Sequence, residues 1–156
     1  MPNLKISGIK NFIVPEFVPR EIWKSFNIKA IRFLSPGLMH VAQKLRDYFD
    51  RPIEINNWYF RSSYSKNVNQ WRGFRTPNCN VGSKLSRHKL GLCLDLNIKG
   101  ILPKELQEDI RINYKPYKAM GITAIEADTP TWTHISMENT LQDDLWVIPN
   151  PNKKDG

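Results

Sequence analysis

The stretch that decides the fold reads Leu92-Cys93-Leu94-Asp95-Leu96-Asn97-Ile98. Large apolar residues alternate in it with smaller or polar ones. Successive side chains of a β-strand point to opposite faces, so this alternation predicts a strand with one apolar face turned to the core. Asp95 belongs to the other face, where its carboxylate can be charged without being buried alone.

Helices and short strands are intermixed around this strand. Ser35-Pro36 is a good helix start, and helical spacing of apolar residues continues it to give a helix over 36–49. A second helix opens at Pro103, breaks near residues 114–116 and ends at Gly121. Further strands are expected over 53–55, 122–126 and 132–137, the last two close enough to pair antiparallel. We therefore expect an α+β fold with a small, mostly antiparallel sheet and helices packed on one face.

The chain has 156 residues, which is the size of one ordinary domain. We expect an N-terminal arm over 1–35, the folded domain over 36–148 and a flexible tail over 149–156. Residues 58–82 are rich in aromatic side chains, Asn and Ser, which indicates a long ordered loop. Such loops are usually functional.

The charge and the apolar pattern limit the partners. The net charge of +8 favours polyanions, of which nucleic acid and the anionic bacterial wall are two. No run approaches the roughly 18 apolar residues that cross a bilayer, so we expect no membrane insertion. The N-terminus lacks the pattern of a secretory signal. Neither cysteine lies in a Cys-x-x-Cys pair, so we expect both to be reduced and do not expect sulfur ligation of a metal.

Two histidines can join Asp95. His88 lies seven positions before Asp95, and Gly91 between them permits the bend that brings both to one face. In the strand over 132–137, Ile135 suits the core, which leaves His134 on the polar side. Two imidazoles and one carboxylate are a normal ligand set for a catalytic zinc that keeps one position open.

A metal-assisted hydrolysis also needs a general base. Glu126 ends an apolar strand shortly before His134, and a carboxylate beside the metal fits that role. Asp128 is the rival, although it lies in the turn. His40 sits in the first helix without a partner nearby in sequence, so we interpret it as structural.

Residues 86–95 read Ser86-Arg87-His88-Lys89-Leu90-Gly91-Leu92-Cys93-Leu94-Asp95 and resemble the S-x-H-x-x-G-x-x-x-D signature of zinc D-Ala-D-Ala peptidases. Their superfamily includes the hedgehog N-terminal domain. Glu126 followed by Trp132-Thr133-His134 looks like the second half of that signature. The stretch 72–78 is similar to the family's G-[YF]-R-S-P-x-x-N motif, and residues 55–58 with the loop after them look like phage versions. The likeness covers about residues 50–137.

The resemblance implies a hedgehog/D,D-peptidase-like zinc peptidase domain. It makes His88, Asp95 and His134 the metal ligands and Glu126 the general base and acid. Arg75 would hold the substrate's carboxylate or the developing oxyanion. The resemblance also assigns substrate-binding roles to three residues: Ser86, Trp132 and Asn78.

The sequence departs from the family at a few positions. Glu126 lies eight positions before His134, a longer gap than in many relatives, so the choice between Glu126 and Asp128 stays open. Cys93 occupies a slot often filled by Ala, which puts it within reach of oxidation or of the metal's surroundings.

Three functions follow from these observations. The first is a zinc metallopeptidase that hydrolyses peptidoglycan stem peptides, as a D,D-carboxypeptidase or an endopeptidase. The absent signal and the basic charge suit a phage protein, either a lysis enzyme held in the host cytoplasm before release or a virion component that contacts other virion proteins. The second is a non-catalytic virion protein or wall-binding module that keeps the fold. The third is a single-strand nucleic-acid binder with stacking aromatics, which we rank last because no recognised motif is present.

Overall fold

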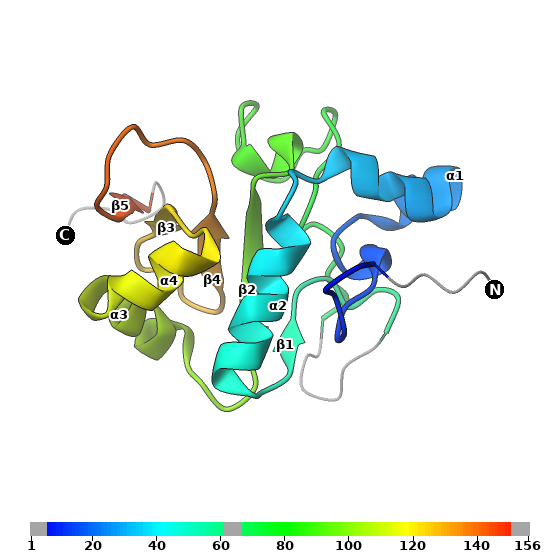
Figure 1. The fold of residues 1–156 in the computed structure, drawn as a ribbon. Coiled ribbons are helices and arrows are strands. Elements are labelled where there is room, and N and C mark those ends of the chain that lie inside the picture. The colour runs from blue at the N-terminus through cyan, green and yellow to red at the C-terminus, as the bar shows by residue number, and fades with distance from the viewer. Residues whose placement is uncertain (1–5, 61–66, 151–156) are drawn as a thin grey trace.

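The computed structural model describes residues 6–60 and 67–150, and Figure 1 shows their arrangement. Residues 1–5 and 151–156, which hold the expected start of the arm and most of the expected tail, lie outside the described residues, as does the middle of the aromatic loop. The described elements, including short 3₁₀ helices marked η, run in this order: η1 (Val14–Glu16), α1 (Arg20–Phe26), η2 (Asn27–Phe33), α2 (Leu38–Phe49), β1 (Ile53–Glu54), η3 (Arg87–Leu90), β2 (Cys93–Ile98), α3 (Pro103–Ile112), α4 (Tyr114–Met120), β3 (Ala124–Glu126), β4 (Thr133–Ser136) and β5 (Trp146–Ile148).

The five strands form one sheet in the order β1-β2-β4-β3-β5. Strand β2 pairs antiparallel with β1 and β4, and β3 pairs antiparallel with β4, as expected for the last two predicted strands. Only the β3–β5 pair is parallel. The α+β class and the mostly antiparallel sheet are therefore confirmed. In Figure 1, α2 and α4 cross the sheet on one side, with α3 beside α4.

The core lies between these helices and the sheet. Leu94 and Leu96 of β2 are fully buried, as the alternation predicts, and Ile135 of β4 and Ile125 of β3 are buried with them. Because these apolar residues face the helices, the intervening residues of β2 and β4 project from the opposite side of the sheet. That side carries Asp95, which pairs in register with His134.

The N-terminal segment is more deeply packed than the term arm suggests. Val14, Phe17 and Val18 are completely buried and belong to the same hydrophobic cluster as the sheet. Phe17 also accepts a backbone hydrogen bond from Phe74 of the long loop, with an N–O distance of 2.7 Å. The segment therefore helps to fix the loop that covers the polar side of β2.

Several boundaries differ from the predicted ones. Helix α2 begins at Leu38 because Gly37 has a φ of 93°, which no α-helix contains. The second helix breaks at Asn113 and resumes as α4, so that Pro116 lies inside its first turn, where the absent N–H costs little. Strand β5 was not predicted. No helix in the described part of the chain is long and apolar enough to span a membrane.

Candidate metal centre

His88 is brought to the polar face of β2 by a sharp turn. It lies in η3, and Ser86 caps this helix by accepting a hydrogen bond from the His88 backbone N–H at 3.3 Å. Gly91 ends the helix with a φ of 66°, which confirms that this glycine makes the bend. A Cβ at Gly91 would lie 2.2 Å from the carbonyl oxygen of Phe33, so glycine is also required by space.

Asp95 lies between the two histidines. Its Oδ1 is 2.8 Å from Nδ1 of His134, and its Oδ2 is 3.2 Å from Nε2 of His88. Ligands that share one tetrahedral zinc at about 2.0–2.2 Å are about 3.4 Å apart. The 3.2 Å separation is close to this value, and the 2.8 Å separation is a hydrogen bond that would lengthen when a cation binds. All three side chains are buried. The structure therefore brings together the three predicted ligands.

The hydrogen bonding of His88 shows that a cation suits this group. Its Nδ1 lies 2.8 Å from the carbonyl oxygen of Gly73, and because a carbonyl can only accept, Nδ1 carries a proton. In the neutral imidazole, Nε2 then turns a lone pair toward Asp95. A lone pair and a carboxylate oxygen repel each other at 3.2 Å unless a proton or a metal ion lies between them. The donor set thus fits a bound metal.

The electrostatics of Asp95 lead to the same conclusion. Burial opposes ionisation of this carboxyl, but the positive charge of protonated His88 and His134 and the hydrogen bonds they donate outweigh it and hold its pKa well below the usual range. With neutral imidazoles, a bound cation would supply that positive charge. Arg75 adds an ion pair, with its Nη2 3.2 Å from Oδ2. Asp95 is therefore an anion, the form in which a carboxylate binds a metal ion.

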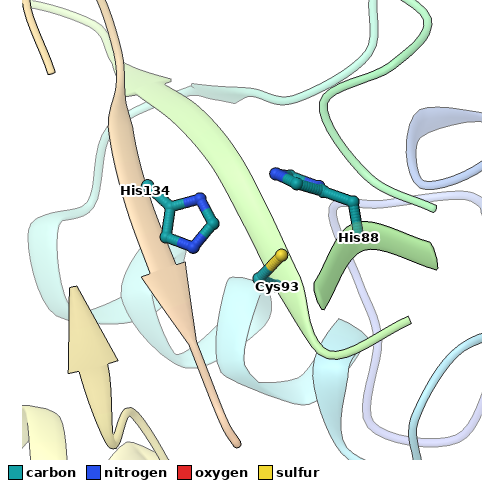
Figure 2. Close-up of side chains that lie close together, drawn as sticks. All are labelled: His88, Cys93 and His134. Carbon is teal, nitrogen blue, oxygen red and sulfur yellow. The ribbon is translucent and has the colours of Figure 1, made fainter. Parts of the chain in front are cut away.

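Cys93 joins the same group, as Figure 2 shows for its sulfur and the two imidazole rings. Its Sγ and a ring nitrogen of each histidine all lie within 4.8 Å of one another, so this buried group can hold a metal ion. A sulfur donor was not expected, because neither cysteine lies in a Cys-x-x-Cys pair. The available signal was position: Cys93 is two residues before Asp95 on one strand and must share its face. Burial, followed by the charge of Asp95, raises the pKa of the Cys93 thiol.

A cleft of about 480 Å³ opens over this group. The lining includes seven of the predicted site residues: Arg75, Ser86, His88, Asp95, Glu126, Trp132 and His134. Asn78 is exposed and is not part of the lining, so the structure does not bring it to the site.

Glu126 is the carboxylate nearest the predicted ligands in this cleft. Its Oε2 lies 4.0 Å from Nδ1 of His134, and its side chain is 24% exposed. Asp128 is not part of the lining and has a φ of 55°, in a turn beyond the strand. The structure therefore brings Glu126 to the cleft, beside His134, and does not bring Asp128 there.

Arg75 is held by three groups of the protein. Its Nε donates to the Trp71 carbonyl at 2.6 Å, its Nη1 donates to the Val81 carbonyl at 3.4 Å, and its Nη2 pairs with Asp95. All three guanidinium nitrogens are thus engaged by protein groups, and one of them contacts Asp95.

No family model, curated protein or solved structure matches this chain. The described residues therefore show a buried group of two histidines and one cysteine that can hold a metal ion, with the Asp95 carboxylate beside both imidazoles and Glu126 in the lining of the cleft.

Proposed function

We propose that this chain is a zinc-dependent peptidase that hydrolyses peptide bonds in the stem peptides of bacterial peptidoglycan. The observation that carries the proposal is the meeting of His88, Asp95 and His134 beneath a cleft whose wall holds Glu126. Three protein donors beside an open cleft are typical of a catalytic metal site, whereas structural zinc sites are closed by four.

We assign the ligands to His88, Asp95 and His134, with Cys93 as a neighbour. Asp95 lies 2.8 and 3.2 Å from a ring nitrogen of His134 and of His88, so one cation can lie between the carboxylate and both imidazoles. Nitrogen and carboxylate donors in this number favour zinc. Gly73 supports the assignment, because its carbonyl fixes the His88 ring with Nε2 toward the site.

The bound cation would polarise the scissile carbonyl and make nearby water more acidic. Glu126 then accepts the proton of the attacking water and delivers it to the leaving amine. The Glu126 side chain is partly exposed at the cleft, so it can reach both the water and the leaving amine. His134 lies beside it, with Nδ1 4.0 Å from Oε2 of Glu126. Trp132 is half-buried in the lining and offers an apolar wall for the peptide.

The substrate class rests on the motif resemblance and on charge. The net charge of +8 would concentrate the protein on an anionic cell wall. The same features support a role in phage lysis or in a virion, where the wall is the barrier to be opened.

Digestion of purified cell walls tests the proposal. The zinc-loaded chain should release peptide fragments that mass spectrometry identifies, a chelator should stop the release, and added zinc should restore it. Glu126→Gln should keep its zinc and lose at least about 100-fold in rate. Asp128→Asn is the matched control, since it makes the same chemical change two residues away and should stay active.

Two outcomes would overturn parts of this account. Full activity in Glu126→Gln would remove Glu126 from the base role. A chain that holds zinc but cleaves no wall preparation would instead be a binding module or virion component that keeps the fold.

A further inference from the structure

A second arginine in the cleft, Arg87, has different contacts from those of Arg75. Arg87 precedes His88 in η3 and lines the cleft beside it. Its Nε forms an ion pair with Glu138, and its guanidinium carbon lies 5.3 Å from the centre of the Trp146 ring. One edge and one face of the guanidinium are therefore fixed by the protein.

The partner of Arg87 is itself held in place. Glu138 is 7% exposed, and its Oε2 accepts a hydrogen bond from the Ser136 hydroxyl at 3.1 Å. Its backbone N–H donates to the same hydroxyl oxygen at 3.3 Å, and its carbonyl accepts from the Thr123 hydroxyl at 2.6 Å. This carboxylate cannot swing away, so Arg87 has a rigid support.

The outer nitrogens of Arg87 remain available. Within the described residues, Nη1 and Nη2 of Arg87 make no hydrogen bond, and its side chain is 36% exposed. Arg75 differs, because its Nε, Nη1 and Nη2 all donate to protein groups. Of the two cleft arginines, Arg87 is the one with a free planar pair of donors, which matches the two oxygens of a carboxylate.

We propose that Arg87 binds the free C-terminal carboxylate of the substrate peptide, which makes the protein a carboxypeptidase that removes one terminal residue. The inference rests on the proposed function and refines its substrate class. Because Arg87 lines the same cleft as His88, Asp95 and His134, a carboxylate bound by Arg87 would bring the last peptide bond into the cleft with these donors. Hydrolysis there consumes one water: the C–N bond breaks, the acyl carbon gains the hydroxyl group, and the terminal amino acid leaves with the proton on its amine.

Two synthetic stem peptides test this, identical except that one ends in a carboxylate and the other in an amide. The zinc-loaded wild type should cleave the acid with a kcat/KM about 100-fold above that for the amide. Arg87→Gln should lose about 100-fold on the acid, mainly through a higher KM, and should lose nothing on the amide, because only the acid uses the ion pair. Arg111→Gln, on the exposed side of α3, is the control and should match the wild type on both.

Zinc content is measured for every variant, because Arg87 adjoins His88. If Arg87→Gln fails to fold or to hold zinc, Trp146→Ala serves instead, since it removes the ring that supports the guanidinium and should raise KM for the acid alone. Equal cleavage of acid and amide by the wild type, or equal loss on both in the variants, would overturn the inference.

Failure of the proposed function gives a different result. In that case neither peptide is cleaved, and calorimetric titration of the zinc-loaded chain with each peptide takes the place of kinetics. Binding of the acid but not the amide, lost in Arg87→Gln, would still support carboxylate recognition. Equal binding of both peptides, or no binding of either, would refute it.

Discussion

Gly91→Ala should cost more stability than any ordinary surface substitution, because two separate penalties meet at this position. The φ of 66° places an L-residue in the left-handed region, which costs about 1–2 kcal/mol. The new Cβ would also lie 2.2 Å from the Phe33 carbonyl oxygen and 3.0 Å from Leu34 Cα. These are backbone atoms that cannot rotate away, so relief requires the chain to shift, at about 1–3 kcal/mol. The expected loss in the free energy of unfolding is about 2–5 kcal/mol.

Urea unfolding of the metal-free chain in the presence of chelator measures this loss without a contribution from zinc binding. With a slope of about 2 kcal/mol per molar urea, the midpoint should fall by about 1–2.5 M. Gly8→Ala is the matched control: its φ is 78°, but the nearest atom to the new Cβ is Nε2 of His40 at 3.4 Å, an ordinary contact. The control should show only the backbone penalty. If the free energy of unfolding falls no further in Gly91→Ala than in Gly8→Ala, the close approach of Gly91 to the backbone of Phe33 adds nothing to the cost of the substitution.

Three further predictions follow from the site and the core. Asp95→Asn should lower zinc affinity at least about 100-fold, measured by competition with a chromophoric chelator, because it removes the anion between the two histidines; unchanged affinity would exclude Asp95 as a ligand. Cys93→Ala should change zinc affinity less than about 10-fold in the same titration, since the three other donors remain; a loss as large as that in His134→Ala would make the sulfur a ligand. Burial raises the pKa of Glu16 from 4.5 to about 7, against an opposing hydrogen bond from Ile13, so the unfolded chain releases this proton at lower pH than the folded one. Stability from this group is therefore present below pH 4.5 and is lost as pH rises through about 7, by at most about 3 kcal/mol. Urea unfolding at pH 5 and pH 8 should show a smaller change in the free energy of unfolding for Glu16→Gln than for the wild type. An equal change in the two proteins would contradict the raised pKa of Glu16.

Most of the fold could be predicted from short-range patterns. The alternation over 92–98 gave β2 because its leucines bury one face, and Gly121 ended α4 because a φ of 106° requires glycine. Strand β5 could not be predicted in this way. It is three residues long, and each of its residues pairs with a β3 residue 22 positions earlier, so its pairing is decided by long-range contacts. The burial of residues 14–18 is likewise a tertiary effect, since their sequence shows only a run of Pro and aromatic residues.

The candidate site also contains some residues that the sequence could predict and others whose contacts depend on the fold. His88, Asp95, His134 and Glu126 could be placed because strand faces and one glycine bend determine their positions. The different situations of the two arginines could not be foreseen. The sequence places both near the motif, but only the folded loops show that Arg75 is committed to protein groups while Arg87 is supported by Glu138 and Trp146.

The most direct test of the metal centre is anomalous diffraction at the zinc absorption edge, from crystals grown with one equivalent of zinc. We expect a single peak within about 2.0–2.2 Å of Nε2 of His88, a carboxylate oxygen of Asp95 and Nδ1 of His134. A strongest peak elsewhere, or one bound by Cys93 while Asp95 pairs only with Arg75, would contradict the proposed centre.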